Sequence, residues 1–239
     1  MKNPAAGGGR WVEVPPERLV SWIVTFARRH GGAGPTTLDE RGAAVTFTAA
    51  DGSAAECHPP FPPVRLAPSP PEERAEPAAV AETLVAHATA DRIVGVLLVR
   101  LGGYAVGVFA GSPPRLVSSK TGSRPVHGRS AAGGWSQHRF ARRRENQAVT
   151  ALRAAADAAA EVFGRYGPDG LDVVVLGGDK RSAAGLGEDP RLEKYVAKAT
   201  ERFLVVPDPR LAVLRDVPRA FLAMRIRLTE PKSVSPAPD

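Results

Sequence analysis

The stretch from Gly128 to Asn146 reads GRSAAGGWSQHRFARRREN and separates a predicted strand hairpin from a predicted long helix. Four small residues at 131–134, AAGG, leave the backbone with little steric restraint, so they predict a flexible tip that protrudes from the fold. Trp135 and Gln137 lie on this tip. An exposed tryptophan indicates a partner, such as a nucleobase face or another protein surface. The alternative is that Trp135 folds back beneath the helix.

The helix after the tip is predicted to run from about Gln137 to Tyr166, because apolar residues recur there at three- and four-residue spacing. Its first two turns contain four arginines: Arg139, Arg142, Arg143 and Arg144. The positive end of the helix dipole disfavours each cation by roughly a few tenths of a kcal/mol. The placement therefore indicates an external anion, since helix N-termini and arginine side chains both bind phosphate oxygens. Glu145 and acids elsewhere neutralise only part of the cluster.

On both sides of this stretch, predicted strands and helices alternate. Strands precede the tip at Ile93–Arg100, Tyr104–Ala110 and Arg115–Ser119. After the long helix come a buried strand at Leu171–Leu176, a helix at Leu192–Ala199, a strand at Phe203–Val206, a short helix at Leu211–Leu214 and a strand at Phe221–Leu228. The alternation predicts an α/β or mixed α+β layer architecture.

A smaller unit precedes this one in the sequence. A helix is predicted between Pro15-Pro16 and Gly31-Gly32, followed by a hairpin within 43–57 that turns at Asp51-Gly52. The predicted organisation is a small α+β domain at 10–58, a proline-rich linker at 59–76 and a larger domain at 77–229. The tails, 1–9 and 230–239, are predicted to be disordered.

The positive charge of the chain is concentrated in one block. The formal net charge is +7, yet residues 92–144 contain ten Lys and Arg and no Asp or Glu, and the rest of the chain is slightly acidic. A block of this kind suits a surface that binds a polyanion and releases counterions from its phosphates. A solvated basic face without a partner is an equal alternative from charge alone.

Several classes of function are disfavoured by composition. The longest strongly apolar run, Ile93–Val99, is far shorter than the roughly 20 residues that cross a bilayer, and 1–18 has no apolar signal core. A single cysteine, Cys57, forms no internal disulfide or cysteine-based zinc cluster, so we expect a cytoplasmic protein. His30, His58 and His87 lack metal-ligand spacing. The run Gly177–Lys180 lacks the spacing of a phosphate loop and is interpreted as a turn.

The run GGWSQHRFARRRE at 133–145 resembles the tip of the middle domain of eukaryotic and archaeal class-1 release factors. In that family Gly-Gly-Gln-Ser is followed by an Arg-Phe-x-Arg-x-Arg helix. The matching residues here are Gly133, Gly134, Ser136, Arg139, Phe140, Arg142 and Arg144. Trp135 stands at the glutamine position and Gln137 lies two residues later. A displaced glutamine is similar to the Vms-type release-factor-like proteins of ribosome quality control, most specifically their actinobacterial peptidyl-tRNA hydrolase branch.

This resemblance covers roughly Arg92 to Leu228 and implies a fold, a substrate and roles for residues. The fold is an RNase H-like mixed sheet with a long helix after the tip. The partners are peptidyl-tRNA and the large ribosomal subunit with its RNA, not DNA or a membrane, and no cofactor or metal is implied. The first unit does not resemble the codon-reading domain of release factors, which implies codon-independent release of stalled nascent chains.

Carried onto this chain, the resemblance gives Gln137 the glutamine role, while the Gly133-Gly134 pair permits the tip geometry. RNA contacts are expected from the residues around them: Arg129, Trp135, Ser136, His138, Arg139, Arg142, Arg143 and Arg144. Two alternatives stay open. His127 and His138 flank the tip and suit an endonuclease that removes the tRNA 3′ end through a ribose 2′-hydroxyl. The third possibility is a non-catalytic RNA- or ribosome-binding protein.

Overall fold

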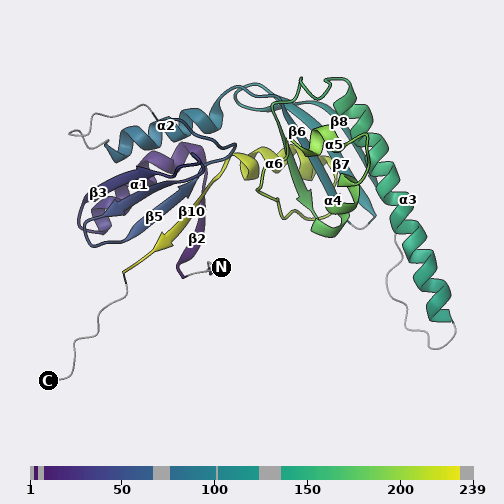
Figure 1. Cartoon of the computed structure of the whole chain (residues 1–239), viewed down its shortest axis with the longest axis horizontal. Coiled ribbons are helices and arrows are strands. Elements are labelled where there is room, and N and C mark those ends of the chain that lie inside the picture. The colour runs from purple at the N-terminus through teal and green to yellow at the C-terminus, as the bar shows by residue number, and fades with distance from the viewer. Residues whose placement is uncertain (1–2, 5–7, 67–75, 101, 124–135, 232–239) are drawn as a thin grey trace. The chain divides into compact units, whose positions relative to one another are not determined.

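The computed structural model describes residues 3–4, 8–66, 76–100, 102–123 and 136–231, without side-chain detail for 3–4 and 136–148. The chain forms two compact units. Unit 1 contains residues 1–90 and 222–239, and unit 2 contains residues 91–221 (Figure 1). The chain therefore leaves unit 1 once and returns to it for its last strand.

Unit 1 is built on an antiparallel sheet with the strand order β1-β2-β10-β5-β4-β3. Its strands are β1 (Asn3–Pro4), β2 (Arg10–Val14), β3 (Ala33–Leu38), β4 (Val45–Ala49), β5 (Ala54–His58) and β10 (Met224–Thr229). The predicted hairpin is confirmed as β4 and β5. Strand β2 and the edge strand β3 carry no clear sequence signal and were not predicted.

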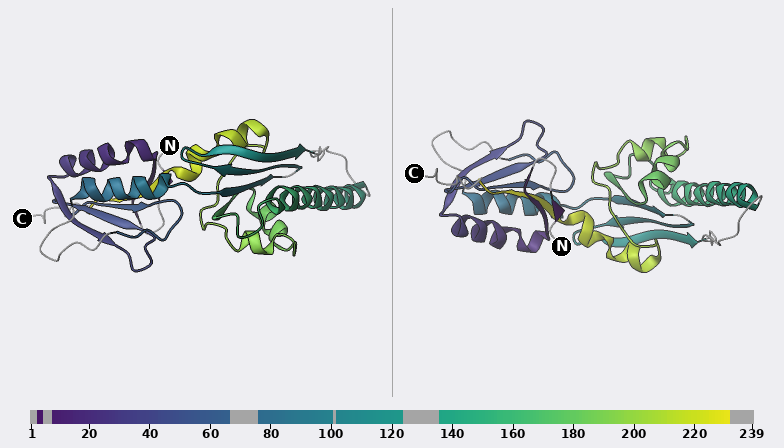
Figure 2. Two further views of the ribbon diagram at one scale, coloured as in Figure 1. Left: turned by 90° about the horizontal axis from the view of Figure 1, so that it is seen from above. Right: turned by 90° about the horizontal axis from the view of Figure 1, so that it is seen from below.

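Two helices cover one side of this sheet, as both views in Figure 2 show. Helix α1 (Pro16–Arg29) begins with proline and buries Leu19, Ile23 and Phe26, which confirms the predicted helix and its apolar stripe. Helix α2 (Pro77–Thr89) buries Leu84 in the same hydrophobic core. The core of unit 1 thus lies between the two helices and the sheet.

The boundary between the units differs from the expected one. We expected residues 77–229 to form the larger domain, but α2 and β10 both belong to unit 1. Strand β10 alternates buried and half-buried residues and pairs with β2 and β5, so Met224 and Ile226 complete the core of unit 1. Periodicity predicts that a strand exists and gives no information on its pairing partner, which here lies more than 160 residues away.

The described part of the proline-rich segment is attached to unit 1. Val64 is 3 % exposed, and its backbone N–H donates to the carbonyl oxygen of Gly42 at 2.7 Å. His87 Nε2 lies 3.1 and 2.9 Å from the carbonyl oxygens of Pro60 and Phe61. Residues 59–66 are therefore packed structure instead of a linker, while 67–75 lie outside the described residues. Of the expected tails, Asn3–Pro4 pairs with β2, whereas 1–2, 5–7 and 232–239 lie outside the described residues.

Unit 2 is built on a mixed sheet with the strand order β8-β7-β6-β9. Its strands are β6 (Val94–Arg100), β7 (Gly103–Ala110), β8 (Arg115–Ser123) and β9 (Val173–Gly178). Strands β6 and β9 are parallel, and the other two neighbouring pairs are antiparallel. All four strands were predicted. The expected strand at Phe203–Val206 is reduced to a single parallel bridge between Leu204 and Gly177.

Helices pack on both faces of this second sheet (Figure 2). The four helices are α3 (Ser136–Gly164), α4 (Lys180–Gly187), α5 (Glu193–Val196) and α6 (Leu211–Leu222). Helix α3 contacts β7 and β8 on one face. On the opposite face Phe221 of α6 meets Phe109 of β7 edge to face, with ring centroids 5.8 Å apart. The architecture is mixed α/β, as the sequence predicts.

One turn prediction and two helix predictions need correction. Residues Gly177–Lys180 are the end of β9 and the start of α4 instead of a simple turn, because Asp179 caps the helix by accepting from the backbone N–H of Arg181 at 2.8 Å. Two of the eight residues of α4 are glycines, which have a low helix propensity, so the local sequence does not predict this helix. Helix α5 is shorter than expected. Helix α6 continues past Pro218, because Leu214 and Phe221 on either side of the proline are buried.

Candidate functional site

The predicted tip is bounded at both ends by described secondary structure. Strand β8 ends at Ser123 and helix α3 begins at Ser136, so the tip segment is residues 124–135. Four expected site residues fall within it and lie outside the described residues: Arg129, Gly133, Gly134 and Trp135. His127 lies there too. The structure therefore fixes where the tip leaves the sheet and where the chain returns.

The other expected site residues lie in the first turns of α3: Ser136, Gln137, His138, Arg139, Arg142, Arg143 and Arg144. Their backbone is helical, which confirms the predicted long helix, and their side chains lie outside the described residues. Residues 136–148 form 13 residues of helix, or about 20 Å at 1.5 Å per residue. Figures 1 and 2 show this part, the stalk, running past the ends of the strands. Gln137 and the arginines therefore lie on the part of α3 that runs past the strands.

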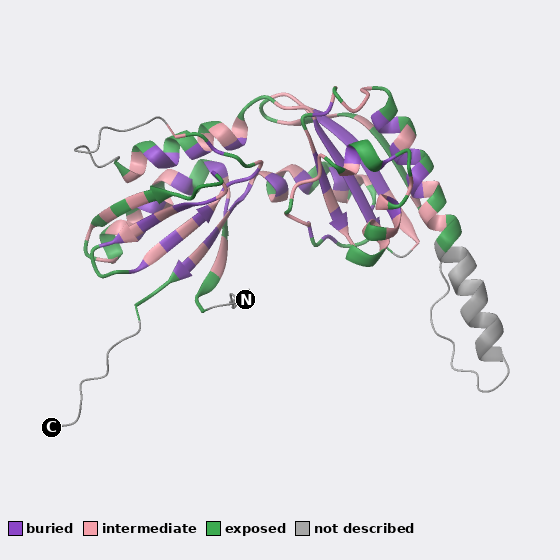
Figure 3. Cartoon of the chain, viewed as in Figure 1, coloured by how far each residue is buried: buried purple, intermediate pink, exposed green. Residues whose placement is uncertain are grey.

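The rest of α3 is anchored by small side chains. Ala155, Ala156, Ala158 and Ala159 are at most 2 % exposed and allow the helix to approach the sheet closely. Figure 3 shows buried residues in the second half of α3. Phe163 fills the space beside Gly95 of β6, where a Cβ atom would lie only 3.2 Å from the phenyl ring. The half of α3 that follows the stalk is therefore closely packed against the sheet.

Ion pairs hold the anchored half of α3 at two places. Lys120 of β8 pairs with Glu161 of α3, and this contact raises the pKa of Lys120 and lowers the pKa of Glu161. After α4, Arg191 lies 2.8 Å from Asp157 of α3 and 2.7 Å from Asp189, and these carboxylates raise the pKa of Arg191. The helix is therefore joined both to the edge strand before the tip segment and to the loop after α4.

The described members of the basic block are partly engaged. Of the ten cations in 92–144, Arg100 donates to the carbonyl oxygen of Val206 at 3.1 Å and Lys120 pairs with Glu161. Burial lowers the pKa of Arg92, and the charge of Asp172 opposes that shift. Six of the ten lie in residues 124–144, within the tip segment and the stalk. More than half of the cations in the acid-free block therefore lie at the candidate site.

Other candidate groups have structural partners. Cys57 is fully buried, and burial raises its pKa to about 12, so it is an inert core residue. His30 Nδ1 lies 2.8 Å from Asp51, and His58 Nε2 lies 2.8 Å from Glu56. Among the described residues there is no cluster of His, Cys, Asp and Glu suited to a metal ion. No helix in the described parts of the chain is long and apolar enough to cross a membrane.

The strand register brings a second segment to the edge from which the tip leaves. Ser123 pairs with Gly103, Gly103 pairs with Arg100, and the neighbouring Val99 pairs with Gly178. The carboxyl ends of β8, β6 and β9 therefore share one edge of the sheet. Sequence analysis did not connect residues 177–181 with the tip, because the parallel pairing of β6 with β9 has no signature in the sequence.

The comparisons with known proteins fall on the unit that carries this site. A family model described as the actinobacteria/chloroflexi VLRF1 release factor matches residues 92–227, more than half of the chain. The chain belongs to this family. The match extends from the start of β6 into β10 and includes the tip segment and the stalk. It confirms the resemblance that the run at 133–145 indicated.

Several solved structures are similar to this chain, including two archaeal proteins. One is the archaeal translation termination factor aRF1, with 13 % sequence identity, a TM-score of 0.39, and coverage of 89 % of this chain and 66 % of that one. The other is described only as an archaeal protein, with 14 % identity, a TM-score of 0.35, and coverage of 87 % and 62 %. The chain thus spans slightly less than two thirds of either structure. A search of curated proteins finds no match.

Proposed function

We propose that this protein is a codon-independent peptidyl-tRNA hydrolase that releases stalled nascent chains from tRNA on the large ribosomal subunit. The observation that carries the proposal is the match to a release-factor family over the unit that bears the tip and stalk. Its place of action is then the cytoplasm, in ribosome quality control.

The backbone of α3 suits this role. A peptidyl-tRNA ester on the ribosome is enclosed by RNA, so a hydrolase must reach it with a narrow, rigid projection. The stalk is a single helix about 20 Å long on a packed, ion-paired base. A rigid support is needed because a displacement of about 1 Å at a reacting centre costs on the order of 100-fold in rate.

The proposed chemistry is ester hydrolysis. A water oxygen attacks the carbonyl carbon of the peptidyl ester, the bond to the ribose 3′-oxygen breaks, and a proton from the water passes to that leaving oxygen. The products are a free peptide acid and an intact tRNA 3′-hydroxyl. Gln137 supplies a neutral amide that orients the water and donates to the developing oxyanion. An amide is no base, so the RNA environment and positioning supply much of the rate.

RNA contacts come from the basic residues around Gln137. Arg129, Arg139, Arg142, Arg143 and Arg144 bind phosphates, together with Ser136 and His138. Trp135 stacks on a base near the CCA end, and the Gly133-Gly134 pair permits the tip backbone to approach closely. An external polyanion offsets the unfavourable position of these cations near a helix N-terminus.

The RNase H-like fold is part of the same proposal. The strand order β8-β7-β6-β9, with β6 and β9 parallel and α3 joining β8 to β9, supports it. The parallel bridge from Gly177 to Leu204 marks the place of a further, shortened strand beside β9. Unit 1 supplies an antiparallel sheet with two helices, and we propose that it contributes no codon reading.

A single-turnover release assay tests the proposal. Large subunits carrying a labelled peptidyl-tRNA are mixed with the wild type, with Gln137→Ala, or with Arg115→Ala as a control at the far end of β8. We expect Gln137→Ala to lower the release rate at least 100-fold with binding retained, and the control to match the wild type. Equal rates in Gln137→Ala and the wild type would leave Gln137 without a catalytic role.

A further inference from the structure

The carboxyl edge of the second sheet carries three cations that lie outside the tip segment and the stalk. Arg100 ends β6, and Lys180 and Arg181 begin α4 directly after β9. Since β6 and β9 are parallel and adjacent, these residues lie at the same edge as Ser123, where the tip segment starts. Three strand spacings of about 4.8 Å place the end of β9 roughly 14 Å from Ser123.

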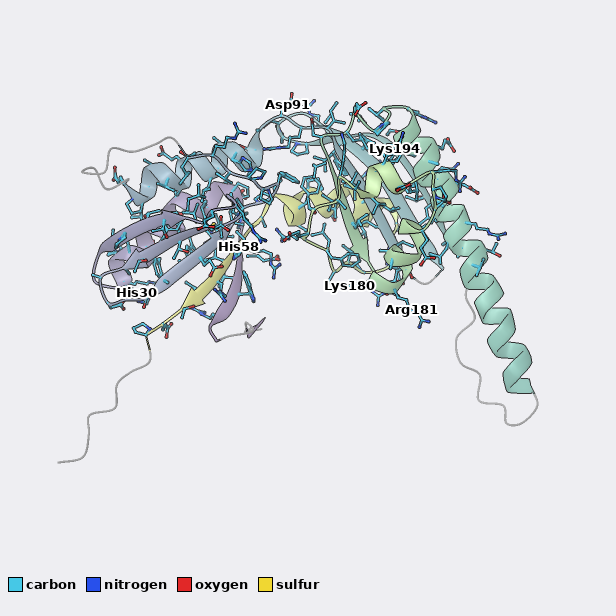
Figure 4. All side chains as sticks on the ribbon, viewed as in Figure 1. His30, His58, Asp91, Lys180, Arg181 and Lys194 are labelled. Atoms are coloured by element: carbon cyan, nitrogen blue, oxygen red, sulfur yellow. The ribbon has the colours of Figure 1, made fainter. Side chains whose placement is uncertain are left out.

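Lys180 and Arg181 are exposed, and neither side chain has an ion-pair partner among the described residues. Figure 4 shows both at the end of unit 2 from which α3 projects. The N-terminus of α4 is occupied by its cap, because Asp179 accepts from the backbone N–H of Arg181 and lies 3.4 Å from the Ser182 hydroxyl. The attraction for an anion at this place therefore comes from the two side chains.

Helix α4 holds these cations in a fixed place beside α3. Its Leu186 is 1 % exposed, and a Cβ atom at Gly185 would lie 3.3 Å from Cδ1 of Leu152 in α3. Leu152 is half-buried and comes shortly after the stalk, so α4 packs where the stalk meets the sheet. The cations of α4 consequently lie at the base of the stalk.

Arg100 lies at the same edge, and its guanidinium can also bind an external anion. Its side chain is 49 % exposed and is oriented by the carbonyl oxygen of Val206 at 3.1 Å. Asp208 lies 3.9 Å from its Nε atom, at the outer limit of an ion pair, and is itself 86 % exposed. Such a pair contributes little in water, so the guanidinium retains donors for an external anion.

We propose that Arg100, Lys180 and Arg181 form a second RNA-contact surface, the base surface, which binds backbone phosphates while the tip reaches the ester. It extends the positive charge of the stalk down to the sheet edge. The proposal rests on the proposed function only in naming RNA as the partner. Charge and continuity with the arginine-rich stalk favour RNA over a protein partner.

Salt-dependent binding of the full-length protein tests the base surface. The two probes are free tRNA and large subunits without tRNA, which separate the two sources of phosphate. We expect Lys180→Ala with Arg181→Ala to weaken binding of one of them about tenfold near 0.15 M salt. The magnitude of the slope of log K against log salt should fall by about 1.4–1.8, or 0.7–0.9 for each lost phosphate contact.

The matched control removes two exposed cations elsewhere in unit 2, by Arg115→Ala with Lys194→Ala. Arg115 pairs with Ala110 at the opposite edge of the sheet, and Figure 4 shows Lys194 at the opposite end from Lys180. We expect the control to keep the wild-type slope with both probes. The charge-preserving swap Lys180→Arg with Arg181→Lys should also keep it.

The outcomes separate this inference from the proposed function. Equal slopes in the Lys180/Arg181 variant and the control, with both probes, would overturn the base surface, even if the wild type releases peptide. A wild type that releases no peptide, but whose tRNA or subunit binding depends on Lys180 and Arg181, would overturn the hydrolase proposal and leave the base surface in place. Circular dichroism confirms that each variant is folded.

Discussion

Lys120 of the edge strand β8 and Glu161 of helix α3 form an ion pair across 41 residues of sequence. The pair joins the strand that leads into the tip segment to the helix that leads out of it. Arg165 adds a second contact to the same carboxylate at 3.1 Å. The half of α3 that follows the stalk is therefore held to β8 by an ion pair and to the rest of the sheet by packing.

The ion pair between Lys120 and Glu161 makes the stability of the fold depend on pH. The pKa of Glu161 is lowered in the folded protein by Lys120, so the pair stabilises the fold above the ordinary carboxyl pKa, and this contribution is lost as the pH falls through the lowered value. We expect Glu161→Gln to lower the melting temperature slightly at pH 7. The difference from the wild type should disappear in acid. A difference that persists at pH 2–3 would show that the effect is not the charge of Glu161.

Packing at the far end of α3 should have a larger effect on stability. Phe163 is 1 % exposed, and the centroid of its ring lies 5.4 Å from the ring centroid of Tyr195. We expect Phe163→Ala to reduce the free energy of unfolding by about 3–5 kcal/mol. Val149→Ala, on the same helix at 44 % exposure, should change it by less than about 0.5 kcal/mol. Urea denaturation measures both, and similar losses would contradict the packing of α3 seen here.

The end of β9 requires glycine. Gly178 has φ = 104°, and a Cβ atom there would lie 2.0 Å from the carbonyl oxygen of Val99. We expect Gly178→Ala to destabilise the protein by about 1–3 kcal/mol and to displace α4. Gly164 at the end of α3 has no neighbouring atom within 4 Å of such a Cβ, so Gly164→Ala should be neutral or slightly stabilising. Thermal melts of the pair check this, and an unchanged melting temperature in Gly178→Ala would count against the strand end described here.

The arginines of the stalk should make the binding of large subunits depend on salt concentration. We expect Arg142→Glu with Arg143→Glu to weaken binding to large subunits and to reduce the magnitude of the salt slope by about 1.4 or more, because two phosphate contacts are lost. Arg115→Glu serves as the single-charge control on β8. Filter binding between about 50 and 200 mM salt measures the slope. Unchanged slopes in the double variant would remove the phosphate contacts assigned to these residues.

The sequence predicted local structure better than pairing. The apolar period gave α1 and α3, and the short apolar runs gave the strands of unit 2, because burial of one face leaves a regular pattern. It missed that β10 belongs to unit 1, since a strand's partner is set by contacts across the whole chain. Helix α4 was not predicted, because its two glycines lower the helix propensity of the segment and the cap by Asp179 is a weak signal in the sequence. The run at 133–145 was enough to indicate the release-factor family, whereas Lys180 and Arg181 entered only through the parallel register of β6 and β9.

The most direct measurement of the central claim is the state of the tRNA after release. Large subunits carrying a stalled peptidyl-tRNA are incubated with the full-length protein, and the released tRNA is isolated and offered to its aminoacyl-tRNA synthetase. Ester hydrolysis predicts free peptide and a full-length tRNA that is recharged without repair. A shortened tRNA, with peptide still attached to a 3′ fragment, would contradict hydrolysis and identify a nuclease. No release at all would contradict both enzyme hypotheses and support a non-catalytic RNA- or ribosome-binding protein.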